Sequence, residues 1–144
     1  RMFIFEWGPE GTDGLMPAFR RHIAALEKDG LQVELEGPEG RLPLARSAQM
    51  QLYGIAREAL ANVVKHSGSE RVRVRVAVHG NRVRLEIEDD GCGFDPSAQP
   101  AGHFGLDSMR SRAEEIGGVL EISSGPGRGT ALRVIVPAET GEPA

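Results

Sequence analysis

A long periodic segment ends in Arg57-Glu58-Ala59-Leu60-Ala61-Asn62-Val63-Val64-Lys65-His66. Its apolar residues recur at i, i+3, i+4, i+7, i+8, i+11 and i+12, and they are Leu52, Ile55, Ala56, Ala59, Leu60, Val63 and Val64. This spacing predicts an amphipathic α-helix that runs from about Ala45 to His66 and buries one stripe in a core.

A second stripe of this helix carries polar groups. At about 100° per residue, Glu58, Asn62 and Lys65 fall along one edge beside the apolar stripe. Carboxylate and amide oxygens suit a hard cation such as Mg²⁺, and an ammonium group suits phosphate. Taken on this helix alone, the stripe is also compatible with an ordinary solvated flank.

The remaining periodicities predict two more helices and about five strands. The helices span residues 14–28 and about 106–116, and the strands span about 31–35, 72–78, 83–88, 119–123 and 130–136. A tight turn at 79–81 makes two strands an antiparallel hairpin. We therefore expect an α+β fold, a two-layer sandwich in which about three helices cover one face of a mixed five-stranded sheet.

Composition limits the class of protein. The 144 residues are 40% hydrophobic and 26% charged, which is typical of a globular domain, and the net charge of -4 argues against nucleic acid as a partner. The single cysteine, Cys92, excludes an internal disulfide and a cysteine metal site. No apolar run approaches the length of a membrane span, so we expect a cytoplasmic fragment without direct membrane contact, with membrane anchoring of the full-length protein left open.

Three glycine-bearing segments follow the long helix: Asp90-Gly91-Cys92-Gly93-Phe94, Gly102-His103-Phe104-Gly105-Leu106 and Gly125-Pro126-Gly127-Arg128-Gly129-Thr130. An acid at a strand end can accept hydrogen bonds from an amine, and glycines beside it let a flat ring approach the backbone. The start of a helix offers free N–H groups to an anion. Each segment alone is more often an ordinary turn or helix start.

In combination and in this order, the four motifs resemble the ATP-binding catalytic domain of a bacterial sensor histidine kinase, in the subfamily typified by nitrate sensors. The wider superfamily includes DNA gyrase, the mismatch-repair protein MutL and a heat-shock chaperone. The resemblance covers residues 14–137 and implies a Bergerat-type ATP-binding fold that uses ATP and Mg²⁺.

The resemblance also implies roles for individual residues. Asn62 is similar to the asparagine that ligates Mg²⁺, and Glu58 to the acid that acts on the attacking group or a metal-bound water. Asp90 is similar to the aspartate that reads the adenine amino group. The expected phosphate and nucleotide contacts are Lys65, His66, Gly91, Gly93, Gly102, Gly105, Leu106, Gly127, Gly129 and Thr130.

Two positions depart from the family pattern. Arg57 stands where many sensor kinases have a histidine before the glutamate, which weakens the case for a His–Glu pair. The second glycine segment reads Gly-His-Phe-Gly-Leu where Gly-x-Gly-Leu is commoner, so the lid amides that meet phosphate are not assigned.

The partners that the resemblance implies lie outside the catalytic domain. We expect residues 1–13 to be the remnant of a preceding dimerisation helix and its linker, and residues 138–144 to be a disordered tail. None of His22, His66, His79 and His103 stands in a phosphoacceptor motif. The phosphate would therefore pass to a histidine on the dimerisation domain of the same full-length protein and then to a response regulator, and the fragment alone would not phosphorylate itself.

Other functions of the same superfamily remain alternatives. A slow ATPase or a nucleotide-sensing switch would use the same pocket, and an anti-sigma-type serine kinase would transfer phosphate to a serine. Intact Glu58, Asn62 and Asp90 argue against a module that only senses nucleotide.

Overall fold

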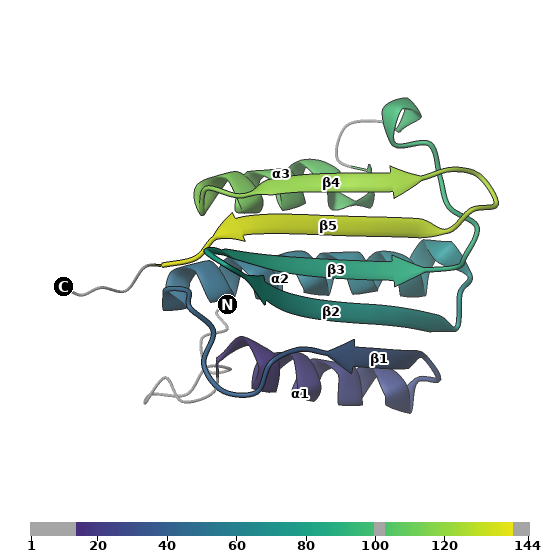
Figure 1. The fold of residues 1–144 in the computed structure, drawn as a ribbon. Helices are drawn as coiled ribbons and strands as arrows, with labels where there is room; N and C mark the ends of the chain where they lie inside the picture. Colours follow the sequence, from purple (N-terminus) through teal and green to yellow (C-terminus); the bar gives the residue numbers. More distant parts are fainter. Residues whose placement is uncertain (1–13, 100–102, 140–144) are drawn as a thin grey trace.

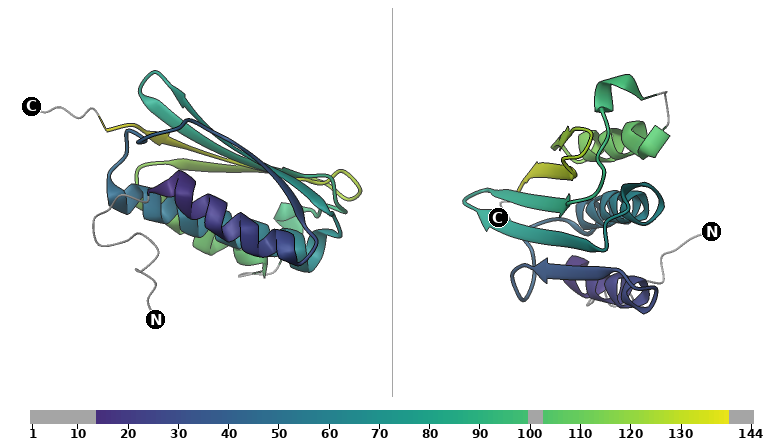
Figure 2. Two further views of the ribbon diagram at one scale, coloured as in Figure 1. Left: turned by 90° about the horizontal axis from the view of Figure 1, so that it is seen from below. Right: turned by 90° about the vertical axis from the view of Figure 1, so that its right-hand side faces the viewer.

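A computed structural model of the chain describes residues 14–99 and 103–139. Five strands form one sheet in the order β1-β2-β3-β5-β4, in which β1 and β2 are parallel and the other neighbours are antiparallel. Figures 1 and 2 show the three long helices together on one face of this sheet. The expected α+β two-layer sandwich with a mixed sheet is confirmed.

The elements follow the predicted spacings closely. The helices are α1 (Leu15–Lys28), α2 (Arg46–Asn62) and α3 (Leu106–Glu115), and the strands are β1 (Gln32–Glu36), β2 (Arg71–His79), β3 (Arg82–Asp89), β4 (Val119–Ser124) and β5 (Thr130–Pro137). Within the described ranges, none of the helices is long and apolar enough to cross a membrane.

The core lies between the sheet and the helices. Alternate residues of the central strands face inward and are buried, among them Val74, Val83, Leu85 and Val134. The apolar stripe of α2 covers them with Leu52, Ile55, Ala56, Ala59 and Leu60. The residues between them along each strand face away from the helices, as the pleat of a sheet requires.

The end of α2 differs from the predicted helix. The α-helix stops at Asn62 and continues as a π-helical turn, Val63–Ser67, before Gly68 ends it in a left-handed conformation. Val63 stays in the core, but Val64 is 57% exposed. We expected Val64 in the apolar stripe, and this was wrong because the wider π turn changes the face that each residue presents.

One buried amide joins the starts of α1 and α2. Gln49 Oε1 accepts a hydrogen bond from the Leu15 backbone N–H (2.9 Å), and Gln49 Nε2 donates to the Leu44 carbonyl (3.0 Å). No side chain of its own caps the first turn of α1, so Gln49 supplies the missing acceptor from another element.

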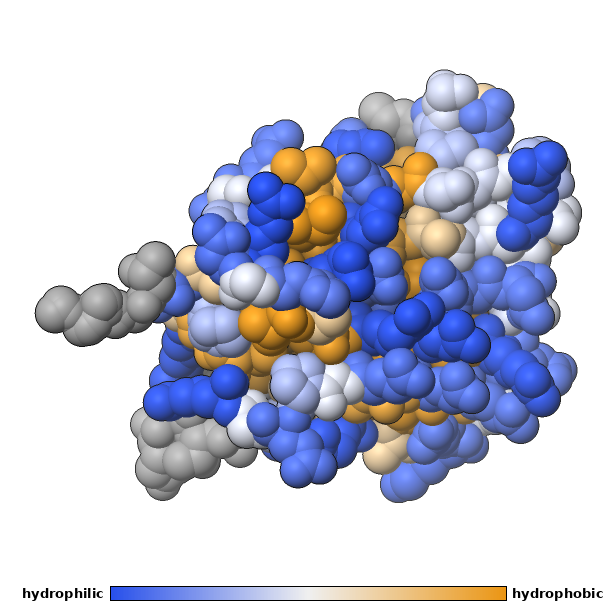
Figure 3. Space-filling view, viewed as in Figure 1, coloured by the Kyte–Doolittle hydropathy of each residue, from blue (hydrophilic) through white to orange (hydrophobic). Residues whose placement is uncertain are grey.

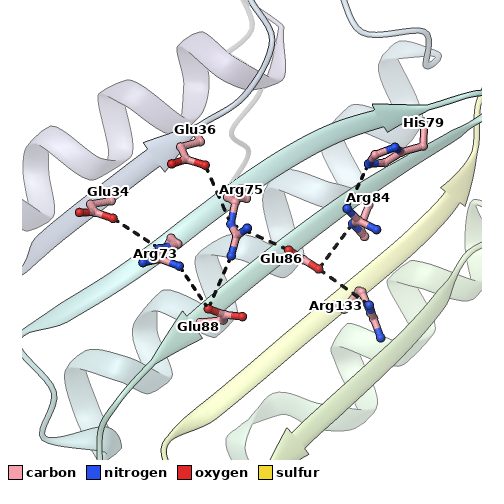
Figure 4. A network of polar contacts seen from close by, with 9 residues as sticks. All are labelled: Glu34, Glu36, Arg73, Arg75, His79, Arg84, Glu86, Glu88 and Arg133. Atoms are coloured by element: carbon pink, nitrogen blue, oxygen red, sulfur yellow. Dashed lines mark hydrogen bonds and ion pairs between the residues drawn. The ribbon is translucent and has the colours of Figure 1, made fainter.

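The outer face of the sheet carries charges that pair across the strands. Figure 3 shows this face as largely hydrophilic, with smaller apolar patches, and Figure 4 shows its centre. Arg73 contacts Glu34 (3.4 Å), and Arg75 lies 3.8 Å from Glu88. Further pairs join Glu86 to Arg84 and Arg133, and Arg133 to Glu121. The arginines of β2 thus face glutamates on the open side of the sheet.

The ends of the domain are only partly described. Residues 1–13 and 140–144 lie outside the described part of the chain. The first residues of the expected tail are bonded to the domain, since Ala138 N–H donates to the Asn81 carbonyl and Glu139 N–H to the Pro43 carbonyl, each at 2.7 Å. At these two residues the backbone continues the hydrogen bonding beyond β5.

We predict that Gln49→Ala lowers the free energy of unfolding by about 2–3 kcal/mol, because a buried N–H and a buried carbonyl both lose their partner. Chemical denaturation measures this. Gln51→Ala is the control: Gln51 lies nearby on α2 and bonds Glu115 and Arg112 at the surface, so its cost should stay below about 1 kcal/mol. Equal costs for the two variants would contradict the role of Gln49.

Candidate functional site

A cavity of about 50 Å³ lies under the end of α2. The end of α2, the end of β3, the start of α3 and strands β4 and β5 enclose it, at the end of the sheet where the loop after β3 and the β4–β5 turn meet (right in Figure 1). Its lining is mostly apolar and includes Ala59, Val63, Ile87, Phe94, Phe104, Leu106, Met109, Ile122 and Leu132. The polar groups that line it are Asn62, His66, Ser67, Asp89 and Thr130.

The acid in this cavity is Asp89. It continues the inward alternation of Val83, Leu85 and Ile87 along β3, and it pairs with Thr130 across β5. Asp90 is exposed and does not line the cavity, and its carboxylate accepts a hydrogen bond from Ser69 Oγ (2.7 Å). The expectation that Asp90 is the acid of this site is therefore corrected, because successive strand residues point to opposite sides.

Burial raises the pKa of the Asp89 carboxyl above its ordinary value. Hydrogen bonds from the Gly91 backbone N–H (2.8 Å) and from the Ser67 side chain act in the opposite direction, and the neighbouring charge of Asp90 raises the pKa further. A half-buried carboxylate with free lone pairs in an apolar cavity is suited to accept a hydrogen bond from a ligand.

Phe104 lines the cavity together with this acid. Its ring stacks on Phe94 with 4.2 Å between centroids, and His66 meets it edge-on at 4.7 Å. Phe104 is the one non-glycine residue of the described ranges with a positive φ, 61°, which is a strained conformation for a residue with a side chain. The space that is left, about 50 Å³, has room for a few water molecules and is too small for a purine.

The polar stripe of α2 meets the start of α3. Asn62 Nδ2 donates to the Phe104 carbonyl (2.7 Å), and Gly105 lies so close to the side chain of Glu58 that a Cβ at Gly105 would clash with it. Asn62 and Glu58, predicted to share one edge, thus both contact the turn that begins α3. Leu106, the first residue of α3, is buried and lines the cavity.

The glycine segments pack against each other at the level of the backbone. A Cβ at Gly93 would clash with the Gly125 carbonyl, and one at Gly129 with the Asp89 carbonyl. We expected the glycines beside the acid, Gly91 and Gly93, to admit a flat ring. In the structure, Gly93 and Gly129 also allow chain segments to touch. Gly127 N–H donates to the Cys92 carbonyl (2.6 Å) and joins the β4–β5 turn to the loop after β3.

The remaining predicted residues are placed as follows. His66 lines the cavity, and Thr130 lines it with its hydroxyl 2.8 Å from Ser124 Oγ. Lys65 is exposed and lies outside the lining, and Gly102 falls outside the described residues. Across the described ranges no three His, Cys, Asp or Glu side chains gather as metal ligands, so a cation here would depend on Asn62 and Glu58 with other oxygen donors.

Residues 47–140 match the family described as "Histidine kinase-, DNA gyrase B-, and HSP90-like ATPase". The chain belongs to this family. The membership that the four motifs predicted is confirmed, and the glycine contacts around Asp89 are the geometry in which this ATPase domain holds those motifs together.

Several sensor proteins resemble this ATPase domain in sequence. The sensor histidine kinase LiaS of Bacillus subtilis is 35% identical over 92% of the chain, and the nitrate/nitrite sensor proteins NarQ and NarX of Escherichia coli are 40% and 38% identical over 71% and 88%. The chain spans 36%, 19% and 22% of these three relatives.

Solved structures share the fold at lower identity. The blue-light activated histidine kinase EL346 of Erythrobacter litoralis has a TM-score of 0.73 at 20% identity, over 87% of this chain and 42% of that one. The mycobacterial sensor histidine kinase MprB has a TM-score of 0.66 at 19% identity, over 88% of this chain and 95% of that one. Both comparisons concern the fold alone.

Sequence reasoning missed several residues of the site. The signal for Asp89 was present, since Glu86 and Glu88 had to face outward if Leu85 and Ile87 faced inward. Ser67 continues the α2 stripe four residues after Val63, but a serine beside glycine looked like a helix end. For the rings of Phe94 and Phe104 there was no local signal, because their contact joins residues ten positions apart in a loop.

We predict that Phe104→Gly is more stable than Phe104→Ala by about 1 kcal/mol, because only glycine adopts the left-handed conformation without a steric cost. Thermal or chemical denaturation gives the order. Arg110, exposed within α3, is the control: there the Gly variant should be the less stable by about 1 kcal/mol, since glycine disfavours a helix. The same order at both positions would refute the left-handed turn.

Proposed function

We propose that this domain binds Mg-ATP and donates the γ-phosphate to a histidine on a separate dimerisation domain in two-component signalling. One observation carries the proposal: a half-buried acid, Asp89, lines an apolar cavity below the end of the helix that presents Asn62 and Glu58. An apolar cavity that holds a carboxylate, beside oxygen ligands for a cation, is the arrangement that a nucleotide needs once the cavity has widened.

Asp89 is the proposed reader of the base. Its carboxylate accepts from the adenine amino group, and Thr130, paired with it on β5, adds a hydroxyl to the same cavity. Guanine presents a carbonyl oxygen at the corresponding edge, so two acceptors would face each other and ATP is favoured over GTP. This proposal replaces Asp90 with Asp89 in the role that the motif suggests.

Asn62 and Glu58 are the proposed groups for the cation and the phosphates. Because the Asn62 Nδ2 group is engaged by the Phe104 carbonyl, its side-chain oxygen is left to ligate Mg²⁺, which would neutralise phosphate charge. Glu58 lies on α2, and its side chain contacts Gly105 at the start of α3, where it can orient a water or an attacking group. Lys65 and His66, which follow on the π turn, supply positive charge and hydrogen-bond donors for the phosphates.

Entry of the base requires the ring of Phe104 to leave its place on Phe94. The cavity of about 50 Å³ is otherwise too small, and Phe94 then offers its face to the adenine ring. The strained backbone at Phe104 lowers the cost of this displacement, because the residue gives up an unfavourable conformation when it moves.

The identity of the phosphate acceptor is part of the proposal, because the described residues do not identify it. The relatives are sensor histidine kinases, and the chain spans a third or less of most of them, so we place the phosphoacceptor histidine on a dimerisation domain and the next transfer on a response regulator. A slow ATPase activity and transfer to serine are the outcomes that would change this assignment.

Asp89→Asn should weaken ATP binding by about 1.5–3 kcal/mol, because one charge-assisted hydrogen bond to the amino group is lost. Asp90→Asn is the matched control and should leave the affinity within about twofold, since Asp90 lies outside the cavity. Calorimetry with ATP and GTP measures both. In the wild type, ATP binding should also weaken as the pH falls through the raised pKa of Asp89. The ionised carboxylate only accepts hydrogen bonds, whereas the protonated form also carries a donor, which the adenine amino group cannot use.

The opposite pattern, a loss with Asp90→Asn alone, would return the reader role to Asp90. Equal affinities of the wild type for ATP and GTP would remove base recognition by a carboxylate from the proposal altogether.

Incubation with labelled ATP and Mg²⁺ should leave the fragment unlabelled, because transfer needs an acceptor nitrogen held within about 3–3.5 Å of the γ-phosphorus. Addition of the dimerisation domain of the same full-length protein, as a separate chain, should give an acid-labile and base-stable label on that chain. Asn62→Ala should abolish the label while the fold survives, since Asn62 is only half-buried.

Stoichiometric acid-labile label on the fragment alone would place the acceptor within it. An acid-stable label would indicate a serine kinase, and phosphate release without any labelled protein would indicate an ATPase.

A further inference from the structure

Ser67 ends the π turn of α2 and points into the same cavity as Asp89. Its side chain is 8% exposed, and Gln49 is the only other polar side chain in the described ranges that is buried as completely. Gln49 has a clear task in joining α1 to α2, whereas the helix itself makes no use of the Ser67 hydroxyl.

The Ser67 hydroxyl is a hydrogen-bond acceptor for Ser69 and a donor to Asp89. Ser67 Oγ accepts from the Ser69 backbone N–H (2.9 Å). A hydroxyl carries a single proton, and this proton serves the hydrogen bond with the Asp89 carboxylate. The Gly91 N–H donates to the Asp89 Oδ1 atom at 2.8 Å, so the carboxylate has two donors.

The backbone holds Ser67 in this place. The Ser67 carbonyl accepts from the Cys92 N–H (2.8 Å), which ties the end of α2 to the loop after β3. Gly91 packs directly on Ser67, and a Cβ at Gly91 would clash with both the carbonyl and the hydroxyl. These contacts hold the Ser67 backbone at the position from which its hydroxyl bonds the carboxylate.

We propose that Ser67 is a positioning residue for base recognition, which donates to Asp89 so that the carboxylate is ionised and its remaining lone pairs face the bound base. This inference rests on the proposed nucleotide function. With Gly91 as the second donor, Ser67 fixes the plane of the carboxylate before a ligand arrives, which avoids the cost of ordering it on binding.

The electrostatic consequence has a definite direction. Burial disfavours the ionised form of Asp89, and the Ser67 hydroxyl is one of the two groups that oppose this effect. Removal of the hydroxyl therefore raises the pKa of Asp89 further. The other charged or titratable groups that share a cavity or groove with Asp89 are Glu34, His66, Arg71, Arg73, Glu88, Asp90 and Arg128.

The test compares Ser67→Ala with Ser69→Ala in the whole chain. Ser69 is the matched control because its hydroxyl bonds Asp90 outside the cavity and its backbone N–H is retained in the variant. Carbon-detected NMR titration without nucleotide should show a higher pKa for Asp89 in Ser67→Ala and an unchanged pKa in Ser69→Ala. Calorimetry with Mg-ATP at pH 7 should show about tenfold weaker binding for Ser67→Ala only.

The pH profile of ATP binding separates positioning from a merely structural role. In Ser67→Ala the pH at which affinity falls should move upward with the pKa of Asp89. In an Asp89→Asn background, Ser67→Ala should cost no further affinity, because its partner carboxylate is gone. The same loss in both backgrounds, or an unchanged pKa of Asp89 in Ser67→Ala, would overturn the inference.

The failure of this inference is distinguishable from failure of the proposed function. A wild-type chain that binds no ATP, combined with the expected pKa change in Ser67→Ala, would refute the nucleotide function and leave the Ser67–Asp89 contact in place. A wild-type chain that binds ATP with no pKa change in the variant would refute the role of Ser67 alone.

Discussion

Three segments of this domain touch at positions where no side chain fits. The Ser67 carbonyl, the Asp89 carbonyl and the Gly125 carbonyl are each met by a glycine, namely Gly91, Gly129 and Gly93. Because these contacts join the end of α2, the end of β3 and the β4–β5 turn, the position of every polar group in the cavity depends on them. Any residue larger than glycine would separate the segments and move Asp89 relative to α2.

The cavity is the result of two opposed requirements. The sheet and the helices bury apolar stripes, which closes the space around Asp89, while a ligand needs that space open. In the described conformation Phe104 meets the first requirement by stacking its ring on Phe94 in the cavity wall, and its backbone is left-handed. Asn62 and Glu58 bear on both requirements, since they contact the turn that begins α3 and are also the groups that we propose for the cation and the phosphates.

Periodicity was sufficient for the architecture and insufficient for the site. The spacing of Leu52, Ile55 and Ala59 identified α2, and the alternation of Val83, Leu85 and Ile87 identified β3, because burial of one face imposes these repeats. The same alternation would have assigned Asp89 to the inside, had it been continued by one more step. The exposure of Val64 follows from a π turn that no local sequence pattern predicts. The stacking of Phe104 on Phe94 is a tertiary contact, which local patterns do not predict either.

The distribution of charge on the open face of the sheet opposes edge-to-edge pairing between two copies of the domain. The arginines Arg73, Arg75, Arg84 and Arg133 all lie on inner strands, whereas the charged groups on that face of the two edge strands are Glu34 and Glu36 on β1 and Glu121 on β4. Lateral joining of two sheets would bring carboxylates next to carboxylates, with every guanidinium one strand too far away to compensate. The edges of the sheet are thereby protected from continuing into a neighbouring molecule, which is the usual route from a soluble sheet to an aggregate.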